Sequence, residues 1–358
     1  MMPVVATKLF APIPHPAAVR RTRLLQRLDA GLEGAARLLL VEAPAGYGKS
    51  TLLAAWLAAA GRPYSWLSLD QGDDDLARFT WGLVAALRQV AGDGVGQAVE
   101  SLLSMPQAPA PDAVAGSLVN DLLRLEHPVI VVLDDYHVIR SPEVHRVIQV
   151  LLERRPPALH LVIATRADPL LPVARWRARG EVAEIRADEL RFTTEEAGEF
   201  LRRTMNLTVP DEAVAALGAR TEGWAAGLQL AGLSLKGRDA DGVRSFVTSF
   251  SGSHRYVIDY LADEVLRELS SNLRDFMRQT AVLERLSADL CDAVTGWSDS
   301  RTHLAALERA NLFLIPLDDG REWYRYHHLF QDVLRSELSR AERVTLHGRA
   351  AVWYESEG

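Results

Sequence analysis

The first half of the chain alternates short apolar runs with longer amphipathic stretches. The apolar runs have the length and composition of β-strands and lie at 37–42, 63–69, 128–133, 160–164 and 181–186. The sequence also predicts helices, one before the first run at 23–32 and others between the runs at 49–60, 75–90, 112–125 and 142–153. Strands that alternate with helices in this way predict a parallel α/β sheet flanked by helices.

The pattern changes after about residue 186, where helical periods begin and dominate as far as about residue 309. Two short apolar runs, 312–316 and 322–326, then flank an Asp-Asp-Gly turn, which is a β-hairpin signal. Helices followed by a hairpin indicate a winged helix domain, and the segment after it is helical again.

The composition is that of a soluble, folded protein, since 48% of the 358 residues are hydrophobic and 24% are charged. Forty Lys and Arg against 47 Asp and Glu give a formal charge of −7, the wrong sign for a segment that binds DNA through its phosphates. The one cysteine, Cys291, allows no intrachain disulfide and no zinc site, so the expected location is the cytoplasm. No run is long enough to span a bilayer, and no membrane partner is expected.

The clearest chemical signal lies between the first strand and the next helix. The segment Ala43-Pro-Ala-Gly-Tyr-Gly-Lys-Ser-Thr51 matches a phosphate-binding loop, with alanine in place of its first glycine. Glycines let backbone N–H groups turn toward a β-phosphate, and the helix N-terminus adds its dipole. In this pattern Lys49 bridges the β- and γ-phosphates, Ser50 holds Mg²⁺ and Thr51 reaches the α-phosphate side. The loop residues predicted to bind nucleotide are Ala45, Gly46, Tyr47, Gly48, Lys49, Ser50 and Thr51.

Two acids and an arginine extend this prediction. Asp134 ends a buried strand, where it can bind Mg²⁺ through water, and Asp135 can orient or deprotonate the attacking water. Arg166 follows the next buried strand and is suited to read a γ-phosphate. With Lys49 these residues form the predicted catalytic set, and Ser50 and Asp134 are the predicted Mg²⁺ ligands. Solvated aspartates in a turn and a surface arginine are the alternative interpretations.

Other short motifs accompany the loop along nearly the whole chain. They are Thr7-Lys-Leu9, Val19-Arg-Arg-Thr-Arg-Leu24, Asp134-Asp-Tyr-His137, Ala164-Thr-Arg166, Leu190-Arg-Phe192, Gly223-Trp-Ala-Ala-Gly-Leu228 and Tyr326-His-His-Leu-Phe330. Together with the phosphate loop they resemble the nucleotide-binding module of MalT-like, LuxR-family transcriptional activators, a branch of the STAND class of signal-transduction ATPases.

This resemblance implies a P-loop NTPase domain, a helical domain and a winged helix domain that close over ATP or ADP. It implies that Val19, Arg21 and Arg23 line the adenine end of the site, and that His327 reaches the β-phosphate of ADP in a closed, inactive form. A packed interface histidine is the alternative for His327. Trp224, in a helical pattern, is interpreted as a residue that packs domains together.

The resemblance and the change of pattern divide the chain into five predicted parts. These are a lead-in at 1–36 that contributes to the adenine site, a P-loop NTPase domain at 37–187, a helical domain at 188–250, a winged-helix domain at 251–340 and the start of a truncated helical sensor domain at 341–358.

The function implied is a regulatory switch. ADP holds the module inactive, ATP permits self-association, and slow hydrolysis resets the module. The inducer and DNA would bind to C-terminal segments beyond this chain. A P-loop kinase or mechanical ATPase, and a nucleotide-dependent adaptor without DNA-binding output, are the alternatives.

Overall fold

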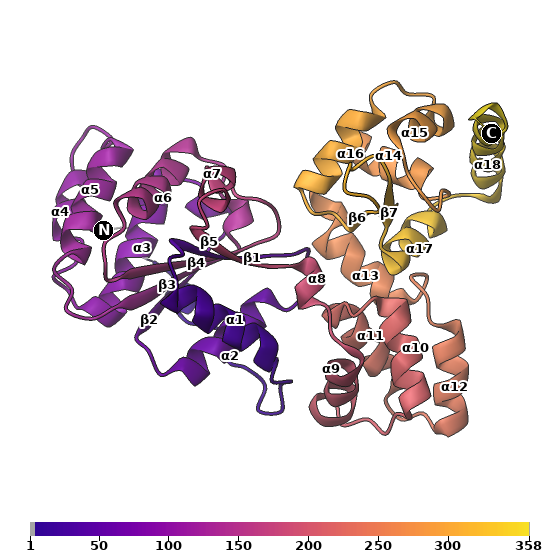
Figure 1. Ribbon diagram of the computed structural model, residues 1–358, viewed down its shortest axis with the longest axis horizontal. Coiled ribbons are helices and arrows are strands. Elements are labelled where there is room, and N and C mark those ends of the chain that lie inside the picture. Colours follow the sequence, from indigo (N-terminus) through magenta and orange to yellow (C-terminus); the bar gives the residue numbers. More distant parts are fainter. Residues whose placement is uncertain (1–3, 358) are drawn as a thin grey trace. The chain divides into compact units, whose positions relative to one another are not determined.

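The computed structural model describes residues 4–357, which gather into two compact units (Figure 1). The first unit contains Arg20–Ala43 and Gly48–Leu190, together with the N-terminal residues up to Pro16. The second contains Ala17–Val19, Pro44–Tyr47 and the chain from Arg191 onward. The first four residues after Ala43 therefore pack with the second unit, whereas the loop continues from Gly48 within the first.

The first unit is built on a five-stranded sheet in which every neighbouring pair is parallel, in the order β2-β3-β4-β1-β5. The strands are β1 (Leu38–Glu42), β2 (Tyr64–Ser68), β3 (Val129–Asp134), β4 (Leu159–Thr165) and β5 (Val182–Arg186). All five overlap the apolar runs that predict strands, with ends that differ by at most one residue, and the expected parallel α/β fold is confirmed. Strand β4 separates β1 from β3, an order that spacing along the sequence does not reveal.

Helices accompany the strands of the first unit. They are α1 (Thr22–Glu33), α2 (Lys49–Ala60), α3 (Leu76–Ala91), α4 (Gln97–Leu103), α5 (Pro111–Leu122), α6 (Pro142–Arg154), α7 (Val173–Arg177) and α8 (Ala187–Leu190), with short 3₁₀ turns η1 (Ala6–Leu9), η2 (Gln71–Asp73) and η3 (Tyr136–Val138). Ser141 caps α6 with its hydroxyl and Pro142 opens that helix.

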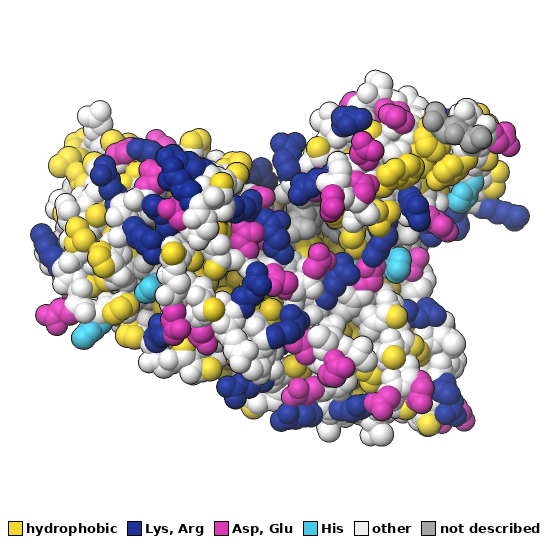
Figure 2. All heavy atoms as spheres, in the orientation of Figure 1, with side chains coloured by type: hydrophobic (Ala, Val, Ile, Leu, Met, Phe, Trp, Pro, Cys, Tyr) yellow, Lys and Arg dark blue, Asp and Glu magenta, His cyan; other side chains and the backbone are white. Residues whose placement is uncertain are grey.

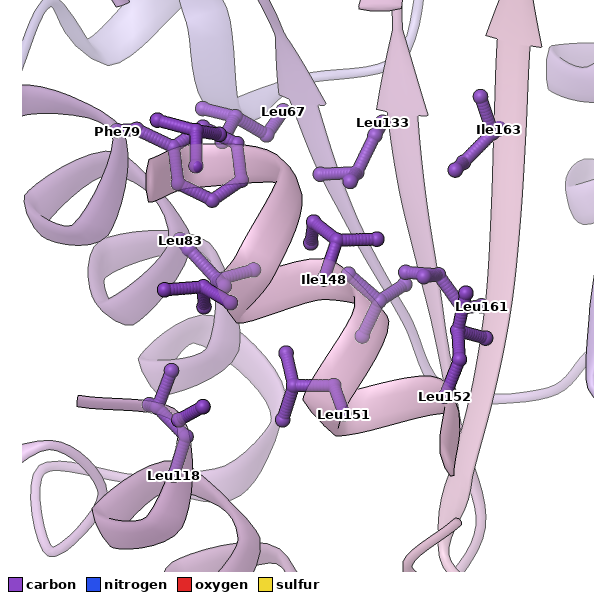
Figure 3. Packing of buried hydrophobic residues seen from close by; sticks show 14 of the residues in the cluster. Leu67, Phe79, Leu83, Leu118, Leu133, Ile148, Leu151, Leu152, Leu161 and Ile163 are labelled. Atoms are coloured by element: carbon purple, nitrogen blue, oxygen red, sulfur yellow. The ribbon is translucent and has the colours of Figure 1, made fainter. Parts of the chain in front are cut away.

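One hydrophobic cluster joins helices α3, α5 and α6 to the sheet (Figure 3). Helix residues such as Phe79 and Ile148 face strand residues such as Leu133 and Ile163, all of them buried. Strand β3 is buried along its whole length, as a central strand covered on both faces must be. This packing fixes the carboxyl ends of β1, β3 and β4, from which the candidate site residues project.

The second unit is helical and includes one small hairpin. Its helices are α9 (Thr194–Glu199), the π-helical turn η4 (Phe200–Thr204), α10 (Asp211–Thr221), α11 (Ala225–Leu235), α12 (Ala240–Ser249), α13 (Arg255–Glu264), η5 (Leu266–Glu268), α14 (Ser271–Thr280), α15 (Ala288–Thr295), α16 (Ser300–Arg309), α17 (His328–Ser336) and α18 (Arg340–Glu357). The hairpin strands β6 (Leu314–Pro316) and β7 (Tyr324–Tyr326) are antiparallel, and helices flank them as a winged helix requires.

Charged side chains of both signs are interspersed on the face seen in Figure 2, and no single stripe of Lys and Arg dominates that view. This distribution agrees with the negative formal charge of the chain. Among the helices of the described residues, none combines the length and the apolar character needed to cross a membrane.

Candidate functional site

Two glycines give the phosphate loop its backbone shape. Gly46 and Gly48 have φ values of 76° and 79°, in the left-handed region that other residues enter only with strain. The space around the two differs. A Cβ added to Gly48 would meet nothing within 4 Å, whereas one added to Gly46 would lie 2.6 Å from the Cβ of Ala226. Gly46 is therefore required by close packing as well as by its φ.

Lys49 is the buried cation of the loop. Its Nζ donates a 2.8 Å hydrogen bond to the carbonyl oxygen of Ala43. Burial lowers the pKa of Lys49 to about 8, the charge of Arg166 acts in the same direction, and the carboxylates of Asp135 and Asp134 oppose both. The side chain thus keeps its positive charge at neutral pH.

The structure brings the two predicted Mg²⁺ ligands together. The hydroxyl of Ser50 donates to Oδ1 of Asp134 at 3.0 Å, and the backbone N–H of Asp135 donates to the same oxygen at 3.0 Å. Burial, followed by the charge of Asp135, raises the pKa of Asp134 to about 6. A hydroxyl and a carboxylate are oxygen ligands of the kind Mg²⁺ takes while keeping several waters. These residues therefore fit the ion.

No group of three or more His, Cys, Asp or Glu side chains within residues 4–357 is arranged to hold a metal ion. The Ser50 and Asp134 pair is thus too small to be a metal cage made of protein ligands alone. This agrees with the way Mg²⁺ is held in nucleotide sites, where phosphate oxygens and water complete its coordination.

Asp135 and Arg166 lie at the same edge of the sheet. Asp135 follows β3 with φ of 56°, and its side chain is 44% exposed, so its carboxylate is open to solvent. Arg166 follows β4, the strand between β1 and β3. Its charge lowers the pKa of both Lys49 and His137, as expected for a neighbouring cation.

Two of the three residues expected at the adenine end contact the same backbone carbonyl. Arg21 is buried, and both it and Arg23 donate to the backbone carbonyl of Glu189, at 3.5 and 2.7 Å. Val19 belongs to the second unit. Contact of these residues with adenine stays a prediction.

His327 is buried in the second unit, with 1% of its surface exposed. Its Nε2 lies 3.0 Å from the carbonyl oxygen of Thr221, and the rings of Trp224 and Phe313 pack against it edge-on. Burial lowers the pKa of His327 to about 4, so the ring is neutral at pH 7. Its contact with a β-phosphate remains a prediction, and in this structure it is a packed histidine.

Two residues near the loop were not among the predicted site residues. The first is Glu42, which ends β1 directly before the loop. Burial and then the charge of Asp168 raise its pKa to about 7, while Arg186 and Arg177 oppose that shift. A single acid at the end of an otherwise apolar strand is the sequence signal that could have drawn attention to it.

The second is Trp224, predicted only as a packing residue. Its indole N–H donates to the carbonyl oxygen of Ala45 at 3.0 Å, within the second unit. In the same unit the ring of Tyr47 lies 6.2 Å from that of Phe313. The Gly-Trp-Ala-Ala-Gly-Leu motif was visible in the sequence, but nothing in it indicates the loop as its contact.

A parallel sheet with a lysine, a serine and an aspartate gathered around a glycine-rich loop at its carboxyl edge defines a P-loop NTPase, here joined to a helical unit with a hairpin. Two family models agree with this class. Residues 19–164 match the AAA ATPase domain, and residues 262–346 match the MalT winged helix domain. These matches confirm the resemblance to MalT-like proteins and the predicted winged helix.

Named relatives match nearly the whole chain. The HTH-type transcriptional regulator MalT of Klebsiella pneumoniae is 33% identical over an alignment of 360 positions, which covers 99% of this chain and 39% of that protein. The serine/threonine-protein kinase PknK of Mycobacterium tuberculosis is 34% identical over an alignment of 365 positions, which covers 99% of this chain and 32% of that protein. The chain thus spans between about a third and two fifths of the length of these relatives.

Among solved structures, the Walker-type ATPase of Pyrococcus abyssi has the same fold. It superposes with a TM-score of 0.61 and 18% sequence identity, covering 90% of this chain and 98% of its own. At this identity the similarity supports the fold alone.

Proposed function

We propose that this chain is the ATP- and ADP-binding switch module of a transcriptional regulator. In this proposal the ADP-bound form is inactive, the ATP-bound form self-associates, and slow hydrolysis returns one to the other. The observation that carries the proposal is the hydrogen bond between Ser50 and Asp134 beside the charged amine of Lys49. These are three groups that would act on one nucleotide, in a chain that matches the MalT winged helix domain.

The loop would bind the phosphates. The backbone N–H groups of residues 45–51 and the N-terminus of α2 supply partial positive charge, and Lys49 supplies a full one. Ser50 and Asp134 would hold Mg²⁺, which when bound neutralises phosphate charge. A carboxylate with a raised pKa binds a cation readily at pH 7, because that pKa is still below neutrality.

Hydrolysis would use the groups at the exposed side of the sheet edge. The carboxylate of Asp135 can accept a hydrogen bond from water and orient it toward a γ-phosphate, and the guanidinium of Arg166 can stabilise the charge that develops there. Differential binding of ATP and ADP, rather than fast turnover, is what a switch needs. His327 is the residue proposed to hold the ADP form, through its place in the winged helix domain.

The nucleotide content of the chain tests this function. The chain is purified without added nucleotide and denatured, and the released nucleotide is identified and counted by chromatography. We expect close to one ADP per chain. Lys49→Ala should reduce the affinity for ADP at least about 100-fold, since Lys49 makes charge-assisted hydrogen bonds to phosphate. The affinity for ADP is measured by isothermal titration calorimetry.

Lys236→Ala is the control for that variant, because Lys236 is an exposed lysine in the second unit. It should bind ADP as the unaltered chain does. Unchanged affinity in Lys49→Ala would exclude the phosphate-loop assignment. An empty site with rapid ATP turnover would favour an ordinary ATPase over a switch.

A further inference from the structure

The first half of the phosphate loop is held by two groups at the start of α11. The indole N–H of Trp224, the N-cap residue, donates to the carbonyl oxygen of Ala45 at 3.0 Å. The backbone N–H of Ala226 donates to the carbonyl oxygen of Gly46, also at 3.0 Å. We call Trp224 and Ala226 the loop clamp. All of these residues belong to the second unit.

The loop clamp packs closely against the loop. A Cβ on Gly46 would lie 2.8 Å from Nε1 of Trp224, 2.8 Å from the hydroxyl oxygen of Tyr260 and 2.6 Å from the Cβ of Ala226. Real Cβ atoms hardly ever approach other heavy atoms so closely. The missing side chain of Gly46 is therefore what lets the clamp reach the backbone.

The indole ring itself is held in place by other rings. Tyr260, Phe313 and His327 surround it edge-on, with ring centroids 5.6, 5.3 and 5.8 Å away. Trp224 has no exposed surface. A side chain packed in this way keeps one rotamer, so its N–H keeps one direction.

Because of peptide geometry, these two hydrogen bonds also determine the directions of two loop N–H groups. A peptide unit is planar and its C=O and N–H point in opposite directions. Fixing the carbonyl of Ala45 therefore fixes the N–H of Gly46, and fixing the carbonyl of Gly46 fixes the N–H of Tyr47. Both N–H groups are directed away from the loop clamp, and both belong to the loop residues predicted to bind phosphate.

We propose that Trp224 is a positioning residue for nucleotide binding, whose indole N–H orients the peptide of Ala45 and Gly46 so that the loop N–H groups can receive phosphate oxygens. The proposal rests on the proposed function, and it adds a residue of the second unit to the determinants of nucleotide affinity.

Trp224→Phe tests this role, because it keeps an aromatic ring in the cluster and removes the N–H. Its matched control is Trp66→Phe. Trp66 is also fully buried, and its indole N–H also makes one hydrogen bond, at 2.9 Å, but to Ser68 two residues along the chain. Both variants lose a buried indole hydrogen bond, and only one of them changes the loop. The affinity for ADP is measured by calorimetry well below both melting temperatures.

We expect the affinity for ADP to fall about two- to tenfold in Trp224→Phe, the range that corresponds to one neutral hydrogen bond, and less than about twofold in Trp66→Phe. The nucleotide-free proteins provide a second readout by hydrogen exchange. In peptides that cover 225–235, exchange should be faster in Trp224→Phe than in the unaltered chain or in Trp66→Phe, since the bond from Ala226 to Gly46 loses its neighbour.

Equal ADP affinities in Trp224→Phe and the unaltered chain would overturn the proposal and leave the proposed function standing. Equal losses in the two variants would also overturn it, because the effect would then be one of general stability. If the unaltered chain binds no ADP at all, the proposed function fails, and the exchange comparison alone decides whether Trp224 orders the loop.

Discussion

Two buried carboxylates, one in each unit, are held in opposite ways. Asp134, at the end of β3, accepts hydrogen bonds from the hydroxyl of Ser50 and the N–H of Asp135. Glu222, at the end of α10, accepts two hydrogen bonds from the guanidinium of Arg325, at 2.9 and 2.8 Å, and one from the N–H of His328 at 3.0 Å. These two donors to Asp134 are neutral groups, whereas Glu222 accepts hydrogen bonds from a cation.

The pKa values follow these surroundings. Burial, and then the charge of Asp135, raise the pKa of Asp134 to about 6. Burial also acts to raise the pKa of Glu222, but the hydrogen bonds and charge of Arg325 outweigh it and lower that pKa to about 2. A buried acid whose charge is balanced inside the chain stabilises the fold. A buried acid whose charge is left for a ligand marks a site, and it reduces stability until the ligand binds.

The largest expected difference between the two acids is in stability. Glu222→Gln should lower the free energy of unfolding by about 2 kcal/mol, because it removes the negative charge that accepts two hydrogen bonds from the guanidinium of Arg325. Asp134→Asn should cause no loss, since it removes a charge whose burial is unfavourable. Urea denaturation of the nucleotide-free proteins at pH 7 measures both.

Each variant keeps the size of its side chain, so cavity effects are matched between them. Similar losses in both would mean that Asp134 also serves the fold, and would end the distinction between the two carboxylates.

The next effect concerns Mg²⁺. In Asp134→Asn we expect the Mg²⁺ concentration needed for tight nucleotide binding to rise about tenfold, since a charged ligand group becomes neutral. Glu222→Gln is the control and should leave the Mg²⁺ dependence unchanged. Titrating ADP at a series of MgCl₂ concentrations gives the comparison. A normal Mg²⁺ response in Asp134→Asn would show that another group holds the ion.

The smallest effect is the pH dependence of stability, and its sign differs between the two acids. The pKa of Asp134 is raised on folding, so its contribution is present below its unfolded pKa near 3.8 and is lost as the pH rises through about 6. The pKa of Glu222 is lowered, so its contribution is present above its unfolded pKa near 4.5 and is lost as the pH falls toward about 2.

From pH 5 to pH 7 the unaltered chain should therefore lose about 1 kcal/mol of stability relative to Asp134→Asn. From pH 5 to pH 3 it should lose part of its advantage over Glu222→Gln, because pH 3 is still above the folded pKa of about 2. Urea denaturation of the three proteins across this range checks both signs. Parallel pH curves would contradict the assignment of opposite pKa shifts.

Local patterns in the sequence predicted a large part of this structure. Every apolar run of the first half became a strand. The inner strands β1, β3 and β4 are rich in Val, Ile and Leu, as strands covered on both faces are. The pairing of Ser50 with Asp134 could be predicted as well, since parallel strands present their carboxyl ends at one edge of the sheet.

The contacts that could not be predicted join distant parts of the chain. The bond from Trp224 to Ala45 spans 179 positions, and the bonds from Arg325 to Glu222 span 103. No periodicity or motif in the sequence specifies which two groups form a hydrogen bond across such distances. The place of β4 between β1 and β3 is of the same kind, because strand order depends on tertiary packing.

That strand order has a consequence for the chain as it leaves the ribosome. Strand β1 (Leu38–Glu42) is the first to be made, but its neighbours are β4 and β5, the last two strands of the sheet. Translation adds about 5–20 residues per second, so roughly 120 residues and several seconds separate β1 from its first partner. During that time the apolar strand that leads into the phosphate loop has no sheet to join, and a chaperone that shields apolar segments would find its substrate there.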